Sequence, residues 1–284
     1  PKISAFYKMS DTLALRASYE EVFRTPIIPN AIDTSLERVY GEYYEVQTPI
    51  PTDLQPESSD NINLGLIWTP VDGMRVNLDY YSLDMVDPIG KVSTTSPLAV
   101  YNCADGTSYN PPAAKPDSCN LINITTAAIN GEGIETDGLD FQMMYDFETS
   151  MGQAQVGFNG VYLLSYDIGG CLTAGCDKYD AAGKYNTRAG GSPIRVRSMP
   201  ELKMNFMASL FNGPHYMRAF VRYVSDYDVA ESFANAGSFA SSPMGYDGKS
   251  VDDMITVDLH YTYAVSDELD LSLSIVNVAD EDPP

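Results

Sequence analysis

Hydrophobic and polar residues alternate with a period of two along most of this chain, and the spacing of an amphipathic helix is hard to find. In residues 61–68, for example, apolar side chains are separated by Asn61, Asn63 and Gly65. The pattern predicts about ten β-strands, each with one apolar and one polar face. They fall at residues 2–8, 13–20, 61–68, 74–80, 139–147, 155–162, 202–210, 217–223, 255–262 and 269–275.

The lengths of the connections alternate between short and long. Short turns are expected at residues 9–11, 69–73, 148–152, 211–214 and 265–268, and long loops at 21–56, 88–131, 168–198 and 230–250. Up-and-down pairing then places all the short turns at one end of the sheet and all the long loops at the other. Outer-membrane β-barrels have this asymmetry, with short periplasmic turns and long external loops, whereas soluble sandwiches have no reason to sort their loops.

Aromatic residues gather near the ends of the expected strands. Tyrosine at a boundary between hydrocarbon and water would form the girdle of a barrel, although tyrosine is also simply a good strand former. The residues are Tyr19, Tyr80, Tyr81, Tyr145, Phe147, Tyr162, Tyr166, Tyr223, Tyr227, Tyr261 and Tyr263.

Charge and hydropathy narrow the possible functions. The chain has 17 Lys and Arg against 39 Asp and Glu, a formal charge of −22, which disfavours a nucleic-acid partner. No apolar run reaches the roughly 18 residues of a membrane-spanning helix. Alternating strands give only a weak hydropathy signal, so the chain can still be a transmembrane β-barrel. The chain starts at Pro1 without a signal peptide, and we therefore expect a piece of a longer protein.

Four cysteines form two local pairs in loop-like surroundings. Cys103 and Cys119 lie in the second long loop, and Cys171 and Cys176 lie in the third. Local pairs in external loops predict two disulfides and an oxidising compartment. A zinc site with four thiolates is the competing interpretation, although neither spacing is that of a CxxC knuckle.

Five segments, in order along nearly the whole chain, resemble the barrel of TonB-dependent receptors. Their counterparts in that family are an F-R-x-P strand end, an L-x-P-E-x-S strand start, the strand that follows, a T-x-G-x-D strand start and an N-L-F-D strand end. Here they are FRTP at 23–26, LQPES at 54–58, NLDYY at 77–81, TDGLD at 136–140 and VNVAD at 276–280.

The resemblance implies an all-β fold, a transmembrane antiparallel up-and-down β-barrel of 22 strands. Residues 1–284 would supply about ten of those strands, numbers 12 to 21, without the N-terminal plug domain and the final strand. It further implies the outer membrane of a Gram-negative bacterium, with lipid, the TonB complex and a small nutrient as partners. The TonB contact would lie in the missing N-terminal region. The nutrient would be siderophore-iron, cobalamin or an oligosaccharide.

Signatures of catalysis are missing from the sequence. We find no G-x-S-x-G elbow and no phosphate-binding loop, and we expect no enzyme, no cofactor and no metal site. His215 and His260 lie on different hairpins, and His260 shares the polar face of its strand with Asp258. A solvated residue of the barrel lumen is the expected role of His260, rather than a catalytic base.

Two groups of residues are candidates for ligand binding. Tyr40, Tyr43 and Tyr44 lie among glutamates in the first long loop, where their rings can stack on sugars or flat chelates. The alternative is a solvated loop without a ligand. Arg218 and Arg222 share a polar strand face, where they can meet an anionic solute or pair with lumen carboxylates such as Asp258 on the adjacent strand.

Energised nutrient import is the function that these observations favour. A complete ten-strand barrel that acts as a passive channel or adhesin is one alternative, because an even strand number permits it. A soluble glycan-binding β-protein is the other, and dependence on detergent would distinguish it from a membrane protein.

Overall fold

The structure, a computed structural model, contains strands and connecting segments. It describes residues 1–26, 31–92, 94, 98–110, 119–131, 133–168, 179–185, 198–229 and 250–282. Within these ranges no helix is long and apolar enough to cross a membrane.

One antiparallel sheet, called the wall below, dominates the molecule, and each of its strands pairs with the next along the chain. The short β14 (Tyr179–Asp180) adds to the edge of β13. All ten predicted strands are confirmed, and several are longer than the alternation indicated. The wall consists of β1 (Lys2–Lys8), β2 (Leu13–Arg24), β5 (Glu57–Trp68), β6 (Met74–Val86), β12 (Ile134–Thr149), β13 (Gly152–Ile168), β17 (Leu202–Asn212), β18 (His215–Val224), β21 (Met254–Ser266) and β22 (Leu269–Ile275).

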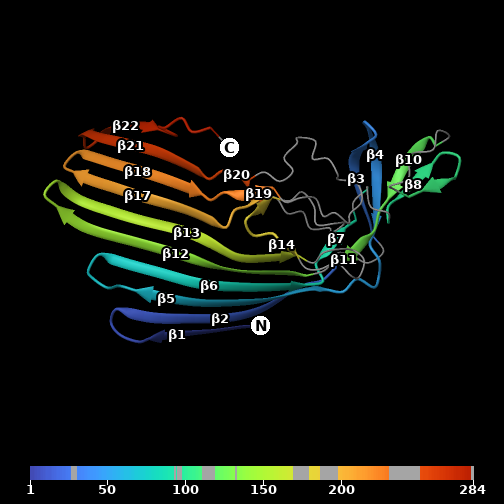
Figure 1. Cartoon of the computed structure of the whole chain (residues 1–284), viewed down its shortest axis with the longest axis horizontal. Helices are drawn as coiled ribbons and strands as arrows, with labels where there is room; N and C mark the ends of the chain where they lie inside the picture. The colour runs from blue at the N-terminus through green and yellow to red at the C-terminus, as the bar shows by residue number, and fades with distance from the viewer. Residues whose placement is uncertain are drawn as a thin grey trace.

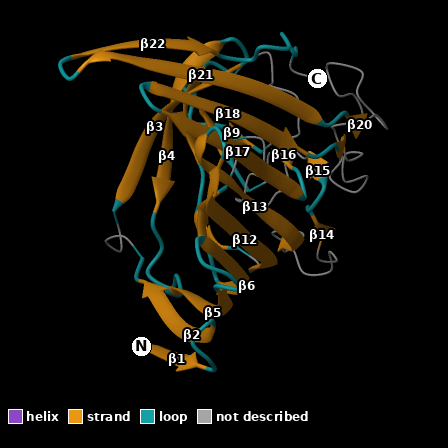
Figure 2. Ribbon diagram, turned by 90° about the vertical axis from the view of Figure 1, so that its left-hand side faces the viewer, coloured by secondary structure: helices purple, strands orange, loops and turns teal. Residues whose placement is uncertain are grey.

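The predicted sorting of connections by length is also confirmed. Short turns join β1 to β2, β5 to β6, β12 to β13, β17 to β18 and β21 to β22 at one end of the wall, and the long connections lie at the other end (Figure 1). Seen along the strands, the wall is an open arc with β1 and β22 at its edges (Figure 2). It is therefore part of a barrel and does not close.

The two faces of the wall differ in the chemistry of their side chains and in the solvent exposure of those side chains. Apolar side chains of one face stay exposed, such as Leu64 at 51% and Leu273 at 59%. Polar side chains of the other face are buried, including Asp79, Ser209 and Asp258. Side chains crowd on the concave side of a curved sheet, so we assign the polar face to the inside of the arc. An apolar exterior and a polar interior are the arrangement of a membrane barrel.

The first two long connections fold together into a second sheet, called the loop module below. It combines β3 (Ile32–Val39) and β4 (Glu42–Pro49) from the first connection with strands of the second, in the order β3-β4-β10-β8-β9. The joint between the connections is a parallel pair of β4 with β10, across which Val46 lies opposite Ile124. The strands of the second connection are β8 (Val100–Cys103), β9 (Ser108–Tyr109) and β10 (Leu121–Thr125).

Smaller sheets complete the loop end. β7 (Ile89–Lys91) pairs with β11 (Ala128–Asn130), where the second connection leaves the wall and returns to it. Farther along the chain, β15 (Lys184–Tyr185), β16 (Ser198–Met199), β19 (Tyr227–Val229) and β20 (Ser250–Val251) form a sheet of four short strands.

Polar contacts fasten the loop end to the wall. Arg24, the last residue of β2, forms an ion pair with Glu57, the first residue of β5. The same carboxylate accepts a hydrogen bond of 2.5 Å from the backbone N–H of Ile89. The Asn130 amide donates to the carbonyl groups of Gln55 and Asp87, and its oxygen accepts from the Gln55 N–H, at distances of 2.8–2.9 Å. Both connections therefore leave the wall from fixed positions.

Candidate functional site

A shallow hollow of about 530 Å³ lies on the polar face, across β2, β6, β12, β13 and β17. Amide side chains cross its floor in register: Asn77 donates to Gln142 over 3.2 Å, and Asn205 donates to Asn159 over 3.0 Å. Lys203 also lines the hollow. Such a surface offers many hydrogen-bond donors and acceptors, as a water-filled lumen requires.

An ion pair spans one intervening strand at the edge of this hollow. Arg16 on β2 donates two hydrogen bonds, of 2.8 and 2.5 Å, to the carboxylate of Asp79 on β6. The two strands are not neighbours, because β5 lies between them and places Gly65 in the same row. A Cβ atom at residue 65 would lie 2.0 Å from the Asp79 carboxylate and 2.5 Å from the Arg16 Nε. Glycine at this position is what allows the two side chains to meet.

The two predicted arginines of β18 have different environments. Arg222 forms an ion pair with Asp258 on β21, which is one of the two predicted outcomes. Arg218 makes no ion pair with any described residue and lies against aromatic rings, 5.2 Å from the centroid of Tyr216 and 5.3 Å from that of Phe220. His260, expected in the lumen, is on the polar face with its ring nitrogens beside Ser274 and Thr262.

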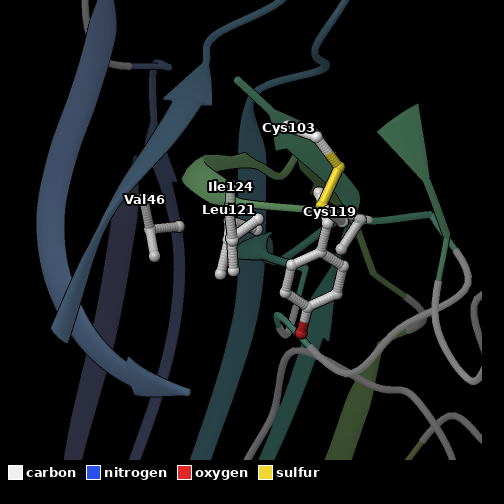
Figure 3. Close-up of a cluster of buried hydrophobic side chains, with 7 residues drawn as sticks. Val46, Cys103, Cys119, Leu121 and Ile124 are labelled. Atoms are coloured by element: carbon white, nitrogen blue, oxygen red, sulfur yellow. A yellow bond between two sulfur atoms is a disulfide. The ribbon is translucent and has the colours of Figure 1, made fainter. Parts of the chain in front are cut away.

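The loop module has a hydrophobic core of its own. Cys103 and Cys119 form a disulfide within it, as predicted, and Ile124 and Val46 are fully buried beside them (Figure 3). The Tyr101 ring stacks on Tyr109 at 5.1 Å, and the Tyr101 hydroxyl donates to a backbone carbonyl. Cys171 and Cys176 lie outside the described residues, so their predicted disulfide stays a prediction.

The three predicted tyrosines of the first connection do not form one cluster. Tyr44 packs against the module core and donates its hydroxyl to Glu42, which raises the pKa of Tyr44. Tyr43 points to the opposite face of the hairpin and is 72% exposed. Tyr40 lies in the turn between β3 and β4, 6.1 Å from the Tyr101 ring, and stays 56% exposed. The module therefore presents Tyr40 and Tyr43 to solvent and uses Tyr44 for packing.

The backbone of Tyr40 is in an unusual conformation. Its φ is +51°, followed by Gly41 at +89°, as in a two-residue hairpin turn with both central residues left-handed. Asn, Asp and Gly are the residues that such turns favour, and a bulky side chain there is rare. The other non-glycine residues with positive φ in the described chain are Asp87, Asn277 and Asp280. Sequence analysis selected Tyr40 for its ring and missed this strain, although Tyr-Gly between two alternating segments is a recognisable signal.

The described residues hold no group of three or more His, Cys, Asp and Glu side chains that could bind a metal ion. Exposed groups that could recognise a solute include tyrosine rings on the loop module and amides and charges on the polar face. Both suit noncovalent binding of a solute.

Comparison with known proteins agrees with this architecture. The family described as "TonB dependent receptor-like, beta-barrel" matches residues 1–278. No curated protein sequence matches the chain.

Solved structures of 12–17% identity show the same fold. A ferric enterobactin receptor of Pseudomonas aeruginosa is 17% identical with a TM-score of 0.65, over 99% of this chain and 35% of that one. The siderophore receptor PirA of Acinetobacter baumannii is 15% identical with a TM-score of 0.63, over 99% and 37%. The copper transporter OprC is 14% identical with a TM-score of 0.55, over 100% and 34%.

The chain thus spans about a third of the length of these structures. The family match covers nearly all of it, and the wall has the strand order, the sorting of connections and the two-faced character of such barrels. The chain belongs to the family of TonB-dependent receptor-like β-barrels.

Proposed function

We propose that this chain is the wall and external recognition region of an outer-membrane receptor that imports a scarce nutrient with energy from TonB. Its apolar face would contact the lipid of a Gram-negative outer membrane. The TonB contact and the plug would be supplied by the rest of the receptor. Binding of a solute by noncovalent contacts, rather than catalysis, suits the exposed rings and amides of the described residues.

The observation that carries the proposal is the strained Tyr40 at the tip of the β3–β4 hairpin. A tyrosine at positive φ costs on the order of 1 kcal/mol that Asn or Gly would largely avoid. A strained residue that stays 56% exposed, although its ring lies 6.1 Å from that of Tyr101, supports a role in function. Figure 1 shows this hairpin at the loop end, beyond the wall strands, and Figure 2 shows it across the open side of the arc. That is where a solute approaching the lumen from the loop end would pass.

A ferric siderophore is the first cargo to test. Two of the three similar structures named above are a ferric enterobactin receptor and a siderophore receptor, and aromatic rings can stack on flat chelates. Cobalamin and oligosaccharides remain candidates, and the likeness to a copper transporter shows that one fold serves several cargoes.

The test is calorimetric titration of the full-length receptor in detergent with ferric enterobactin, cobalamin and maltohexaose. We expect one of these probes to bind, and Tyr40→Asn to weaken that binding by roughly 3- to 10-fold through loss of the ring contact. The same variant should not lower thermal stability, because Asn tolerates positive φ better than Tyr.

Tyr44→Phe is the matched control. It keeps the packed ring and loses only the hydroxyl contact with Glu42, so the affinity should stay as in the wild type. Equal affinity of Tyr40→Asn and wild type, or binding of none of the three probes, would count against the proposal.

A further inference from the structure

One row of polar side chains crosses six wall strands near the short turns. In register from β12 to β22 these residues lie opposite one another: Asp146, Gln155, Ser209, Arg218, His260 and Ser274. The first two are hydrogen-bonded to each other, because Gln155 donates to Asp146 over 2.7 Å. At the other end, His260 and Ser274 lie 2.7 Å apart. Between these two hydrogen-bonded pairs lie the two middle residues of the row, Ser209 and Arg218.

Ser209 and Arg218 are neighbours without polar partners among the described residues. Ser209 is 6% exposed, and its Oγ has no hydrogen bond. The Arg218 Nε is likewise buried and without a partner. Buried donors are satisfied in nearly all proteins, so an unsatisfied pair side by side indicates that something else binds there.

The other arginines of the polar face emphasise this difference. Arg16 is paired with Asp79, and Arg222 is paired with Asp258. Arg75 makes no ion pair with a described residue, but its Nε donates to the Asn77 amide oxygen over 3.3 Å. Tyr216 and Phe220 flank the Arg218 guanidinium on its own strand and shield it from water. Shielding strengthens the attraction of a cation for an anion. In a chain with 39 acidic and 17 basic residues, an arginine held in this way without a carboxylate is unexpected.

We propose that Ser209 and Arg218 form a carboxylate-binding site on the polar face, near the short-turn end of the wall. A guanidinium donates two parallel hydrogen bonds to a carboxylate, and the serine hydroxyl supplies a further donor. One free cation matches the single charge of a carboxylate better than the double charge of a phosphate, because the next arginine is already neutralised by Asp258. The carboxylate belongs either to an acidic side chain of the receptor outside residues 1–284 or to a dissolved anion.

The experiment measures thermal unfolding of the full-length receptor in detergent at pH 7 and at about pH 3.5, with Arg218→Gln compared with wild type. If an acidic side chain of the receptor occupies the site, we expect the variant to melt on the order of 2 °C lower at pH 7. The difference should shrink at low pH, because the carboxylate loses its charge as the pH falls through its pKa in the folded receptor, and a carboxylic acid no longer needs a cation.

Arg222→Gln is the matched control, because its carboxylate partner Asp258 is known. It should show a loss at pH 7 that likewise shrinks at low pH. The other ionisable side chains of the row, His260 and Asp146, are present in every variant. If the Arg218→Gln variant does not assemble, Arg218→Lys is the second variant, because it keeps the positive charge but lacks the paired N–H donors of the guanidinium. It should show the same pH pattern with a smaller change in melting temperature.

A dissolved anion gives a different result. Sodium acetate that replaces chloride at equal ionic strength should then raise the melting temperature of the wild type but not that of Arg218→Gln. Two results would overturn the proposal. One is an equal loss of stability at both pH values without an acetate effect, which would reflect only lost contacts with Tyr216 and Phe220. The other is wild-type behaviour of the variant under every condition.

Discussion

Gly65→Ala tests how a glycine permits an ion pair across a strand. The added methyl group would occupy the space between Arg16 and Asp79, 2.0 Å from one carboxylate oxygen. Both side chains must then move, and the two hydrogen bonds that join them are lost. The Asp79 side chain is only 9% exposed, so its charge would remain sheltered without a partner.

The expected loss follows from this asymmetric burial. Breaking a fully buried pair costs about 3–5 kcal/mol and breaking an exposed pair about 0–1 kcal/mol. The Arg16 side chain is 48% exposed, which discounts the larger figure for solvent screening. We therefore expect Gly65→Ala to lower the free energy of unfolding by about 2 kcal/mol.

The assay is urea unfolding of the full-length receptor in detergent, followed by far-UV circular dichroism, in two backgrounds. In wild type, Gly65→Ala should cost the 2 kcal/mol estimated above. In an Arg16→Ala, Asp79→Ala background the space is empty, and the substitution should be neutral or gain about 0.5 kcal/mol because alanine suits a strand better than glycine. An equal loss in both backgrounds would refute the reasoning, since the cost would then come from the backbone and not from the ion pair.

Other predictions concern the loop end. Replacing Cys103 and Cys119 by serine opens a disulfide between residues 16 apart and should destabilise the loop module by roughly 3 kcal/mol, seen as faster protease cleavage there; unchanged cleavage would argue against this. The Thr107 hydroxyl and N–H hold the pKa of Asp105 below 3.8, so this turn is stabilised above that pH and loses the contribution as pH falls through the lowered pKa. Amide exchange at Thr107, corrected for intrinsic rates, should differ between wild type and Asp105→Asn at pH 7 and converge once the pH has fallen below the lowered pKa of Asp105. Asn130→Ala removes three hydrogen bonds at the loop end, two with Gln55 and one with Asp87, and should cost about 2–3 kcal/mol in urea unfolding, whereas a change below about 0.5 kcal/mol would show that water replaces them.

The wall could be predicted from the sequence because its information is local. Apolar and polar residues alternate with a period of two within each strand, and each wall strand pairs with the next wall strand along the chain. Alternation and turn positions together therefore define the sheet. Wall strands extend beyond the alternating core, as β2 does to Arg24, because pairing with a long neighbour continues after the apolar pattern ends.

The loop module could not be predicted in the same way. Its central joint pairs residues 45–47 with residues 123–125, and no local pattern indicates which distant segment a strand will meet. The same difference between local and long-range information applies to the predicted site residues. Pairing of Arg222 with Asp258 follows from adjacent strands and was one of two predicted outcomes. Tyr43 and Tyr44 point to opposite faces because they are consecutive residues of β4, a strand inside a segment that was expected to be a loop.

The parallel joint between β4 and β10 also bears on how such receptors can be re-engineered. Segments from two different hairpins of the wall share one buried cluster, with Val46 contributed by the first and Ile124 by the second. Grafting either connection alone onto another barrel would leave half of that cluster facing water. The two connections must therefore be transferred together. A recombination experiment that aims to change specificity would have to transfer residues 31–50 and 98–125 as one unit.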